Sequence, residues 1–238
     1  FTPAPACRRA VRDSAHALQA AGALVEPFAI PDAGEMMRIY AGLVTSDGME
    51  SLRRMVSGNR LDRQVRRQLR LGGMPTAVRR VLQWALPLIG EHQLAQLLRA
   101  TGRRRTYSFW QLVDDADSYR REFADAYTHG FDGHPLDAIL LPPYGLPALR
   151  HGTALDVLPA ASYCFLPNLL GWPAAVGPCT RVGETEECDR PASIDRVIRT
   201  ARRVEIGSAG LPIGVQVMAA PWREDIVLAV LSALQSHR

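Results

Sequence analysis

Three short apolar runs constrain the fold of this chain most strongly. They lie at residues 136–141, 174–182 and 213–219, and Pro142 and Pro143 close the first. Runs of this length, bounded by turn residues, are typical of strands that a protein buries on both faces. Helical patterns separate them, and helix followed by strand is the order of an α/β protein. The 238 residues show no internal repeat and suffice for a core, so we predict one α/β domain.

Helices are predicted over most of the remaining chain. Apolar spacing indicates helices over about 7–18 and 34–44, and Gly22 is expected to end the first ahead of a strand at 23–30. Residues 107–129 carry Asp and Arg at spacings that suit ion pairs, so we expect a solvated surface helix.

The C-terminal end predicts one more helix. Pro221 suits the first helical position, and Glu224 and Asp225 suit the first turn because they complement the helix dipole. The polar residues 183–191 precede this region and predict an exposed connection.

Residues 60–100 show an amphipathic helical pattern that a Gly-Pro break at 72–75 divides into two short helices. Apolar positions face arginines, and Trp84 lies nearby. The apolar face can pack on the domain, or it can lie in a membrane interface. Both interpretations stay open on these residues alone.

All 28 basic residues of this chain are arginines, and the sequence contains no lysine. Because a guanidinium keeps its proton, these residues cannot supply a lysine base, nucleophile or Schiff base. Arginines gather at 103–105 and 196–203 and could attract phosphates. Acidic residues are interleaved there without an aromatic stacking platform, so we predict no nucleic-acid partner.

Neither a metal site nor a cofactor is predicted. The four cysteines have no paired spacing and are expected to be free thiols. They are Cys7, Cys164, Cys179 and Cys188. His129, Asp132, His134 and Asp137 bring metal-type ligands close together, but their spacing matches no recognised site, so we predict a polar loop.

The C-terminal third carries the most specific pattern. Residues 162–178 contain an Asn followed by a G-x-P-A-x-x-x-P strand, and Gly-Leu-Pro-Ile-Gly-Val-Gln follows at 210–216. Ala-Pro-Trp-Arg-Glu stands at 220–224, and upstream segments at 1–10 and 41–48 complete an ordered set. This set resembles the amidase-signature family, closest to its fatty acid amide hydrolase branch, along nearly the whole chain.

The resemblance implies a mixed central sheet covered by helices, of which residues 1–238 would form the C-terminal portion. Members of the family hydrolyse carboxylic amides with a Ser-Ser-Lys triad, an acyl-enzyme and backbone oxyanion donors. That machinery lies in the N-terminal half of the family, so no catalytic residue is carried over to this sequence. The expected partners are that catalytic half, from the same gene or a separate chain, and an amide substrate.

The resemblance also assigns roles within this chain. Leu158, Ala161 and Phe165 are expected to line an acyl channel, and Asn168 to tie the backbone of the motif loop. The helix pair at 61–89 takes the position of a membrane cap, and its arginines favour contact with anionic lipid. The residues expected at the cap surface are Leu69, Met74, Val78, Leu82 and Trp84.

Three functions stay open at this stage. The first is part of a serine amidase, with fatty acyl amides as one substrate class. The second is an inactive remnant or partner subunit that binds lipid or protein, and the third is an arginine-rich surface-binding module. We expect a cytoplasmic protein, peripheral at the inner face of a membrane. Because part of a sheet leaves an unpaired edge, we also expect poor solubility or a homodimer.

Overall fold

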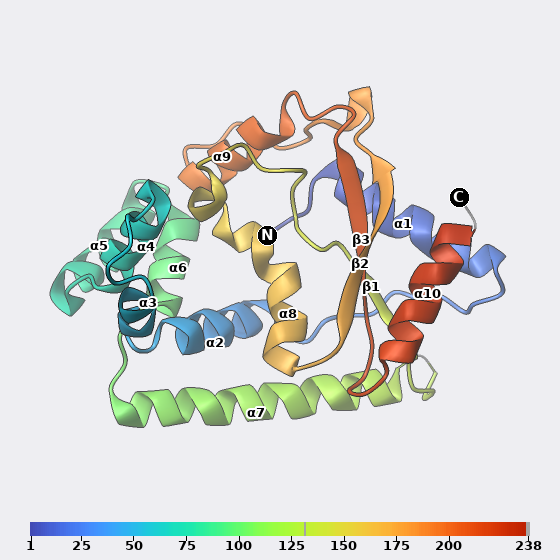
Figure 1. Ribbon diagram of the computed structural model, residues 1–238, viewed down its shortest axis with the longest axis horizontal. Coiled ribbons are helices and arrows are strands. Elements are labelled where there is room, and N and C mark those ends of the chain that lie inside the picture. Colours follow the sequence, from blue (N-terminus) through green and yellow to red (C-terminus); the bar gives the residue numbers. More distant parts are fainter. Residues whose placement is uncertain (131, 237–238) are drawn as a thin grey trace.

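The structure is a computed structural model and describes residues 1–130 and 132–236. In chain order its helices are α1 (Pro5–Ala20), α2 (Ala33–Thr45), α3 (Glu50–Met55), α4 (Arg63–Gly72), α5 (Thr76–Leu88), α6 (His92–Ala100), α7 (Thr106–His129), α8 (Ser162–Leu170), α9 (Arg196–Glu205) and α10 (Glu224–Ser236) (Figure 1). The strands are β1 (Ile139–Leu141), β2 (Ala174–Arg181) and β3 (Pro212–Met218). Short 3-10 helices lie at Ala154–Asp156, Leu158–Ala161 and Glu184–Glu186.

The three described strands form one sheet in the order β1-β3-β2, and β3 runs antiparallel to both neighbours. Met218 of β3 stands opposite Ile139 of β1 and Ala174 of β2. The register of β2 shifts between Pro178 and Thr180. All three apolar runs therefore contain strands, as predicted, although β1 is shorter than its run.

Helices cover both faces of this sheet (Figure 1). Val215 and Val217 of β3 face α1 and α10 and join a buried cluster with Leu18 and Val227. Met218 joins a second cluster, together with side chains of α7 and α8. Alternate residues of β3 point to opposite faces, so a strand buried on both sides needs a continuous apolar run. The predicted helix-covered sheet is confirmed.

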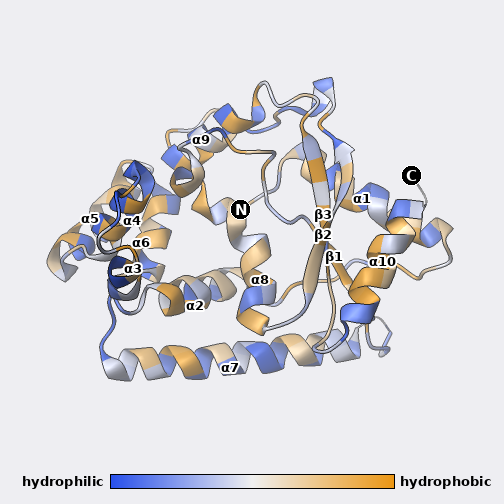
Figure 2. Cartoon of the chain, viewed as in Figure 1, coloured by the Kyte–Doolittle hydropathy of each residue, from blue (hydrophilic) through white to orange (hydrophobic). Residues whose placement is uncertain are grey.

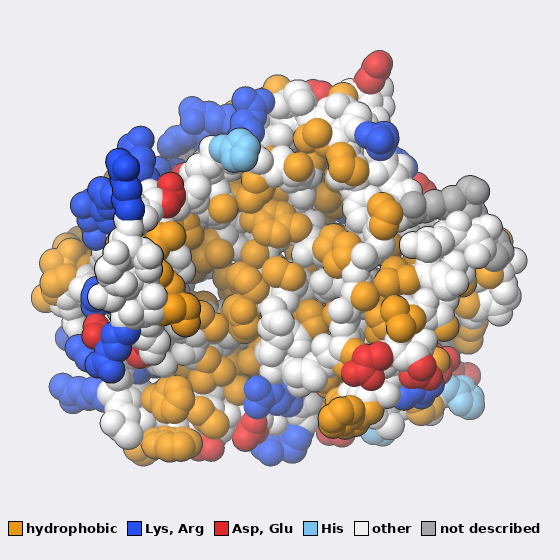
Figure 3. Space-filling model, in the orientation of Figure 1, with side chains coloured by type: hydrophobic (Ala, Val, Ile, Leu, Met, Phe, Trp, Pro, Cys, Tyr) orange, Lys and Arg blue, Asp and Glu red, His pale blue; other side chains and the backbone are white. Residues whose placement is uncertain are grey.

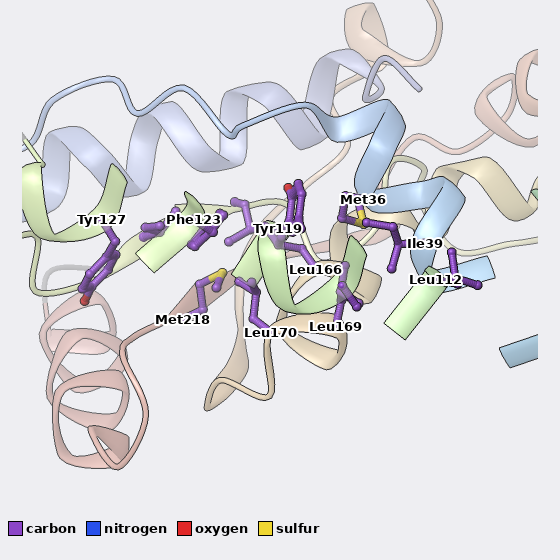
Figure 4. Close-up of a cluster of buried hydrophobic side chains, with 13 residues drawn as sticks. Met36, Ile39, Leu112, Tyr119, Phe123, Tyr127, Leu166, Leu169, Leu170 and Met218 are labelled. Carbon is purple, nitrogen blue, oxygen red and sulfur yellow. The ribbon is translucent and has the colours of Figure 1, made fainter. Parts of the chain in front are cut away.

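Helix α7 contributes more to the core than the sequence predicts. Its buried residues recur every three or four positions and form one apolar face. They are Leu112, Ala116, Tyr119, Phe123 and Tyr127 (Figure 4). The Phe123 and Tyr127 rings both meet Trp172 edge-on, at centroid distances of 5.2 and 4.8 Å. The prediction of a solvated helix holds only for the opposite face of α7. It is based on the spacing of Asp and Arg and overlooks the apolar residues between them.

Two predictions at element boundaries are wrong. Residues 23–30 form no strand, although Phe28 and Ile30 pack against the core, because no neighbouring strand pairs with their backbone. Gly22 does follow α1 with a positive φ of 93°. The last helix begins at Glu224, and the left-handed Trp222 (φ 66°) separates it from Pro221.

Helices α3 to α6, residues 50–100, form a separate group that we call the helical lobe (Figure 2). The predicted break between two helices is confirmed, since α4 ends at Gly72 and α5 begins at Thr76. A third helix, α6, follows Gly90, whose φ is 80°. The lobe contacts the rest of the molecule mainly through α6, which packs against α2 and α9, and Arg67 of α4 adds an ion pair with Asp156.

Candidate functional site

The predicted channel residues lie on one continuous segment. Leu158 and Ala161 belong to a 3-10 helix, and Phe165 follows in α8. Ala161 is buried, whereas Leu158 and Phe165 are half-buried. The Phe165 ring stacks on Tyr40 of α2, with centroids 4.4 Å apart and an angle of 18° between the ring planes. The structure thus joins α8 and α2 into one apolar wall.

Tyr40 is the part of this wall that the sequence did not reveal. Burial is the main cause that raises the pKa of its phenol, and a hydrogen bond with the Asn168 side chain lowers it. A phenol with a raised pKa stays neutral in mildly basic solution. The wall therefore carries no charge at Tyr40 near neutral pH.

Asn168 is exposed, and its Nδ2 donates to the Cys164 carbonyl oxygen, 2.9 Å away and one helical turn earlier. This contact lies within α8 rather than in a loop, and the side chain is at the surface. Pro167 inside the helix donates no backbone hydrogen bond, and Gly171 ends the helix with a φ of 71°. Asn168 thus lies in the last turn of α8.

A small apolar cavity of about 290 Å³ lies near the wall but has different residues around it. It is lined by residues 143–144 and 146–149, by Cys7 of α1, and by Pro212, Ile213 and Gly214 of β3. Burial raises the pKa of the Cys7 thiol to about 11, and the charge of Glu205 acts in the same direction. Cys7 is therefore a protonated, weakly nucleophilic thiol. None of the three predicted channel residues lines this cavity.

Sequence reasoning missed a buried ion pair beside the N-terminus. Arg190 Nε donates to Glu205 Oε1 at 2.7 Å, and the two side chains are 7% and 0% exposed. The Arg190 guanidinium also lies over the Phe1 ring, 4.4 Å from its centroid, and donates to the Thr2 carbonyl oxygen. The Cys188 thiol donates to Glu205 Oε2. The connection at 183–191 is therefore only partly exposed, and charge composition gave no sign of its buried arginine.

The predicted cap residues divide between two environments. Val78 and Trp84 of α5 are 48% and 74% exposed, whereas Leu69 of α4 is buried at 7%. Leu69 therefore cannot belong to an outward-facing surface. Met74 and Leu82 are half-buried. The other exposed apolar side chains on and directly after α5 are Val81, Leu88 and Ile89.

A buried arginine, Arg79, connects helix α5 to the rest of the helical lobe. The Arg79 side chain is 8% exposed and donates to the carbonyl oxygens of Leu71, Leu98 and Thr101. The hydroxyl of Thr101 accepts a further bond, at 2.9 Å. Burial lowers the pKa of Arg79, with the Arg104 charge acting in the same direction. Arg79 of α5 thus faces inward, whereas Val78, Val81 and Trp84 face solvent.

Metal-type ligands do not converge among the residues that the structure describes. Among residues 1–130 and 132–236, no group of three or more His, Cys, Asp or Glu side chains could hold a metal ion. In the predicted polar loop, His129 Nδ1 lies 2.8 Å from the Asp125 carbonyl oxygen of its own helix. The four cysteines are free thiols, as predicted. Each helix in the described part of the chain is too short or too polar to span a bilayer.

Comparison with known proteins places these features in a family. The family model "Amidase" matches residues 1–228. Fatty acid amide hydrolase 1 of Caenorhabditis elegans is 31% identical over 238 residues, which cover 99% of this chain and 41% of that protein. Fatty-acid amide hydrolase 1 of Sus scrofa is 30% identical over 244 residues, which cover 98% of this chain and 40% of that protein.

A solved structure named fatty acid amide hydrolase superimposes with a TM-score of 0.65 at 18% sequence identity, which supports the fold. It matches 100% of this chain and 37% of the other. This chain thus spans about two fifths of the length of the curated relatives it matches, which fits the predicted C-terminal half. The chain belongs to the amidase family and resembles its fatty acid amide hydrolase branch.

Proposed function

We propose that this chain forms the C-terminal part of a serine amidase that hydrolyses fatty acyl amides. The observation that carries the proposal is the match to two fatty acid amide hydrolases along 98–99% of this chain but only 40–41% of their length. A Ser-Ser-Lys triad needs a lysine, and these 238 residues have none. The proposed triad therefore lies in a segment that this sequence does not contain.

The proposed reaction is nucleophilic acyl transfer. A serine oxygen attacks the amide carbonyl, the amine leaves with a proton, and water then hydrolyses the acyl-enzyme to a fatty acid. In this scheme Ala161, Phe165 and Tyr40 form one wall of the channel that holds the acyl chain. Their apolar surface, and a phenol that stays neutral, suit an alkyl chain because no charge has to be desolvated when it binds.

The direct test compares the full-length protein with residues 1–238 alone. We expect the full-length protein to react with a fluorophosphonate probe and to release ammonia from a long-chain primary amide. We expect the isolated chain to do neither. Turnover by the isolated chain would place the nucleophile within residues 1–238 and refute the proposal that the triad lies outside them. A full-length protein that binds amides without hydrolysing them would favour an inactive remnant.

The wall itself is tested by Phe165→Ala in the full-length enzyme. We expect KM for a long-chain amide to rise about tenfold, because several buried methylenes lose contact. KM for acetamide should barely change, since a short acyl group does not reach the wall. Phe109→Ala on α7 is the matched control, because Phe109 is also half-buried but lies outside the proposed wall. An equal loss with both substrates would show that Phe165 supports the fold rather than the channel.

We further propose that α5 is the membrane-facing part of the protein. Its exposed side chains Val78, Val81 and Trp84 follow helical spacing, and the same helix exposes Arg80. An apolar helix face with basic neighbours suits the interface of an anionic membrane. Figure 2 shows this apolar colouring along α5 at the edge of the molecule.

Flotation with anionic vesicles tests the role of α5. Val81→Ser with Trp84→Ser should lower binding by about tenfold or more, because two exposed apolar side chains no longer enter the interface. The matched control is Leu228→Ser with Trp222→Ser, which removes similar side chains that are 63% and 88% exposed elsewhere. Equal binding by both double variants would contradict a specific membrane face.

A further inference from the structure

A polar cavity of about 600 Å³ opens beside α9, and its residues belong neither to the proposed channel wall nor to α5. Three arginines of α9 line it, at positions 196, 199 and 203, so they share one helix face. Arg150 reaches the cavity from the loop after β1. Figure 3 shows basic side chains gathered over α9 and neighbouring α4. The cavity is thus bounded by four guanidinium groups from two segments.

Two of these arginines donate a hydrogen bond to a backbone carbonyl oxygen and still have N–H donors free. Arg150 Nη2 donates to the Ile206 carbonyl oxygen at 3.0 Å, and Arg199 Nη1 donates to the Ile194 carbonyl oxygen at 3.1 Å. A guanidinium has about five N–H donors, so one such bond orients the side chain and leaves most donors available. The Arg203 side chain has no hydrogen bond or ion pair with any described residue. The positions of Arg150 and Arg199 are therefore fixed, while most of their N–H donors remain available to a ligand.

The acidic groups nearby do not cancel this charge. Asp156 is the only carboxylate among the described residues that line the cavity, and it is 14% exposed. Its Oδ1 lies 2.7 Å from Arg67 of α4 and 3.2 Å from Arg196, so two cations share it. Glu91 lies next to the cavity and accepts the backbone N–H of Arg196 at 2.9 Å. Arg150, Arg199 and Arg203 have no carboxylate partner in the described structure.

We propose that this cavity binds a phosphate group, carried by a free phosphate or by the headgroup of an anionic lipid. Planar guanidinium forks match phosphate oxygens in pairs, and several forks around one hollow favour a multiply charged anion. Thr153 and Thr200 also line the cavity, which adds hydroxyl groups to its polar surface. The proposal does not depend on amide hydrolysis, because no residue of the cavity belongs to the proposed channel wall.

The test uses the full-length protein and two kinds of probe. Calorimetric titration with inorganic phosphate and with pyrophosphate measures binding of a free anion. Sedimentation with phosphatidylcholine vesicles, with and without phosphatidate, measures binding of a lipid headgroup. Arg199→Gln with Arg203→Gln should weaken binding of the ligand about tenfold or more, since the charged hydrogen bonds of both guanidinium groups to the anion are lost. Arg54→Gln with Arg121→Gln removes the same charge from exposed positions outside the cavity.

Each outcome decides the proposal. Loss of phosphate or pyrophosphate binding in the cavity variant, but not in the control, supports a site for a free anion. Loss of phosphatidate-dependent sedimentation in the cavity variant alone supports a headgroup site. Equal losses in the two double variants would show diffuse charge attraction and overturn the proposal. Absence of binding to every probe would also overturn it, as expected if an acidic segment of the full-length protein fills the cavity.

Discussion

Arg190 and Arg79 are the two arginines that are buried in the described structure, and their surroundings differ. Arg190 lies beside the sheet and pairs with Glu205, whose side chain is fully buried. Arg79 lies in the helical lobe and meets carbonyl and hydroxyl oxygens, but no carboxylate. A buried cation with a carboxylate is compensated by charge, whereas one among carbonyls is compensated only by dipoles.

The same two regions differ in where their apolar side chains point. In the sheet region, apolar faces of α1, α7, α8 and α10 turn inward onto the strands. In the lobe, α5 turns Arg79 inward and leaves Val81 and Trp84 outside, at 64% and 74% exposed. Burial of apolar surface stabilises the sheet region, while hydrogen bonds to one arginine organise α5. The comparison shows that amphipathicity alone does not say which face is buried.

The largest expected effect is in the sheet region. Glu205→Gln leaves Arg190 buried without its carboxylate, which should lower the free energy of unfolding by about 3–5 kcal/mol. Urea unfolding of the full-length protein measures this change. Exposed Glu122→Gln on α7 is the control and should change stability by no more than about 0.5 kcal/mol. A Glu205 variant as stable as the control would mean that dipoles suffice to compensate the Arg190 charge. The proposed difference between Arg190 and Arg79 would then be wrong.

A smaller effect is expected in the lobe. Arg79→Met removes the side-chain donor from the carbonyl oxygens of Leu71 and Thr101, at a cost of about 1–3 kcal/mol, whereas Gln83 still donates to Leu98. Because the lobe joins the molecule mainly through α6, amide hydrogen exchange should speed up in α5 and α6 but not in β3. Exposed Arg80→Met is the matched control on the same helix. Faster exchange throughout the sheet would show that the two regions unfold as one.

The smallest effect concerns pH and the Cys7 thiol near the Arg190 pair. Folding raises the pKa of Cys7 from 9.0 to about 11, so above pH 9 the unfolded chain loses this proton before the folded one. Stability should therefore be complete below pH 9 and fall as pH rises towards 11. Between pH 8 and pH 10 the expected loss is about 1 kcal/mol. Urea unfolding at both pH values should give a smaller loss for Cys7→Ala, and an identical loss would contradict the assignment.

Local patterns predicted much of this fold. Short apolar runs indicated the three strands because a strand buried on both faces has no polar side to show. Helical spacing and the Gly-Pro break located α1, α2, α4, α5 and α7 within a few residues, because propensity and breakers act locally. The segment at 23–30 looked equally apolar but forms no strand, since pairing depends on a partner that is distant in sequence.

The candidate site was predictable to a lesser degree. Ordered motifs indicated the amidase family, and the positions of Leu158, Ala161 and Phe165 followed from them as a proposal. Tyr40, stacked on Phe165, is 125 positions away in the sequence, and no local pattern connects the two. Leu69 and Trp84 also looked alike as apolar positions, yet one is buried and the other exposed. Which side of a helix meets the core depends on its neighbours.

The sequence by itself determined that these residues contain no lysine chemistry, that three runs are strands, and that the chain belongs with the amidases. Composition and short-range periodicity suffice for the first two conclusions because they need only residue identity and spacing, whereas the family follows from the resemblance of ordered motifs. Tertiary structure alone decided that Arg190 meets Glu205, that α5 faces outward, and that four arginines surround one cavity. Those outcomes depend on long-range packing, in which burial, charge compensation and chain connectivity must be satisfied together.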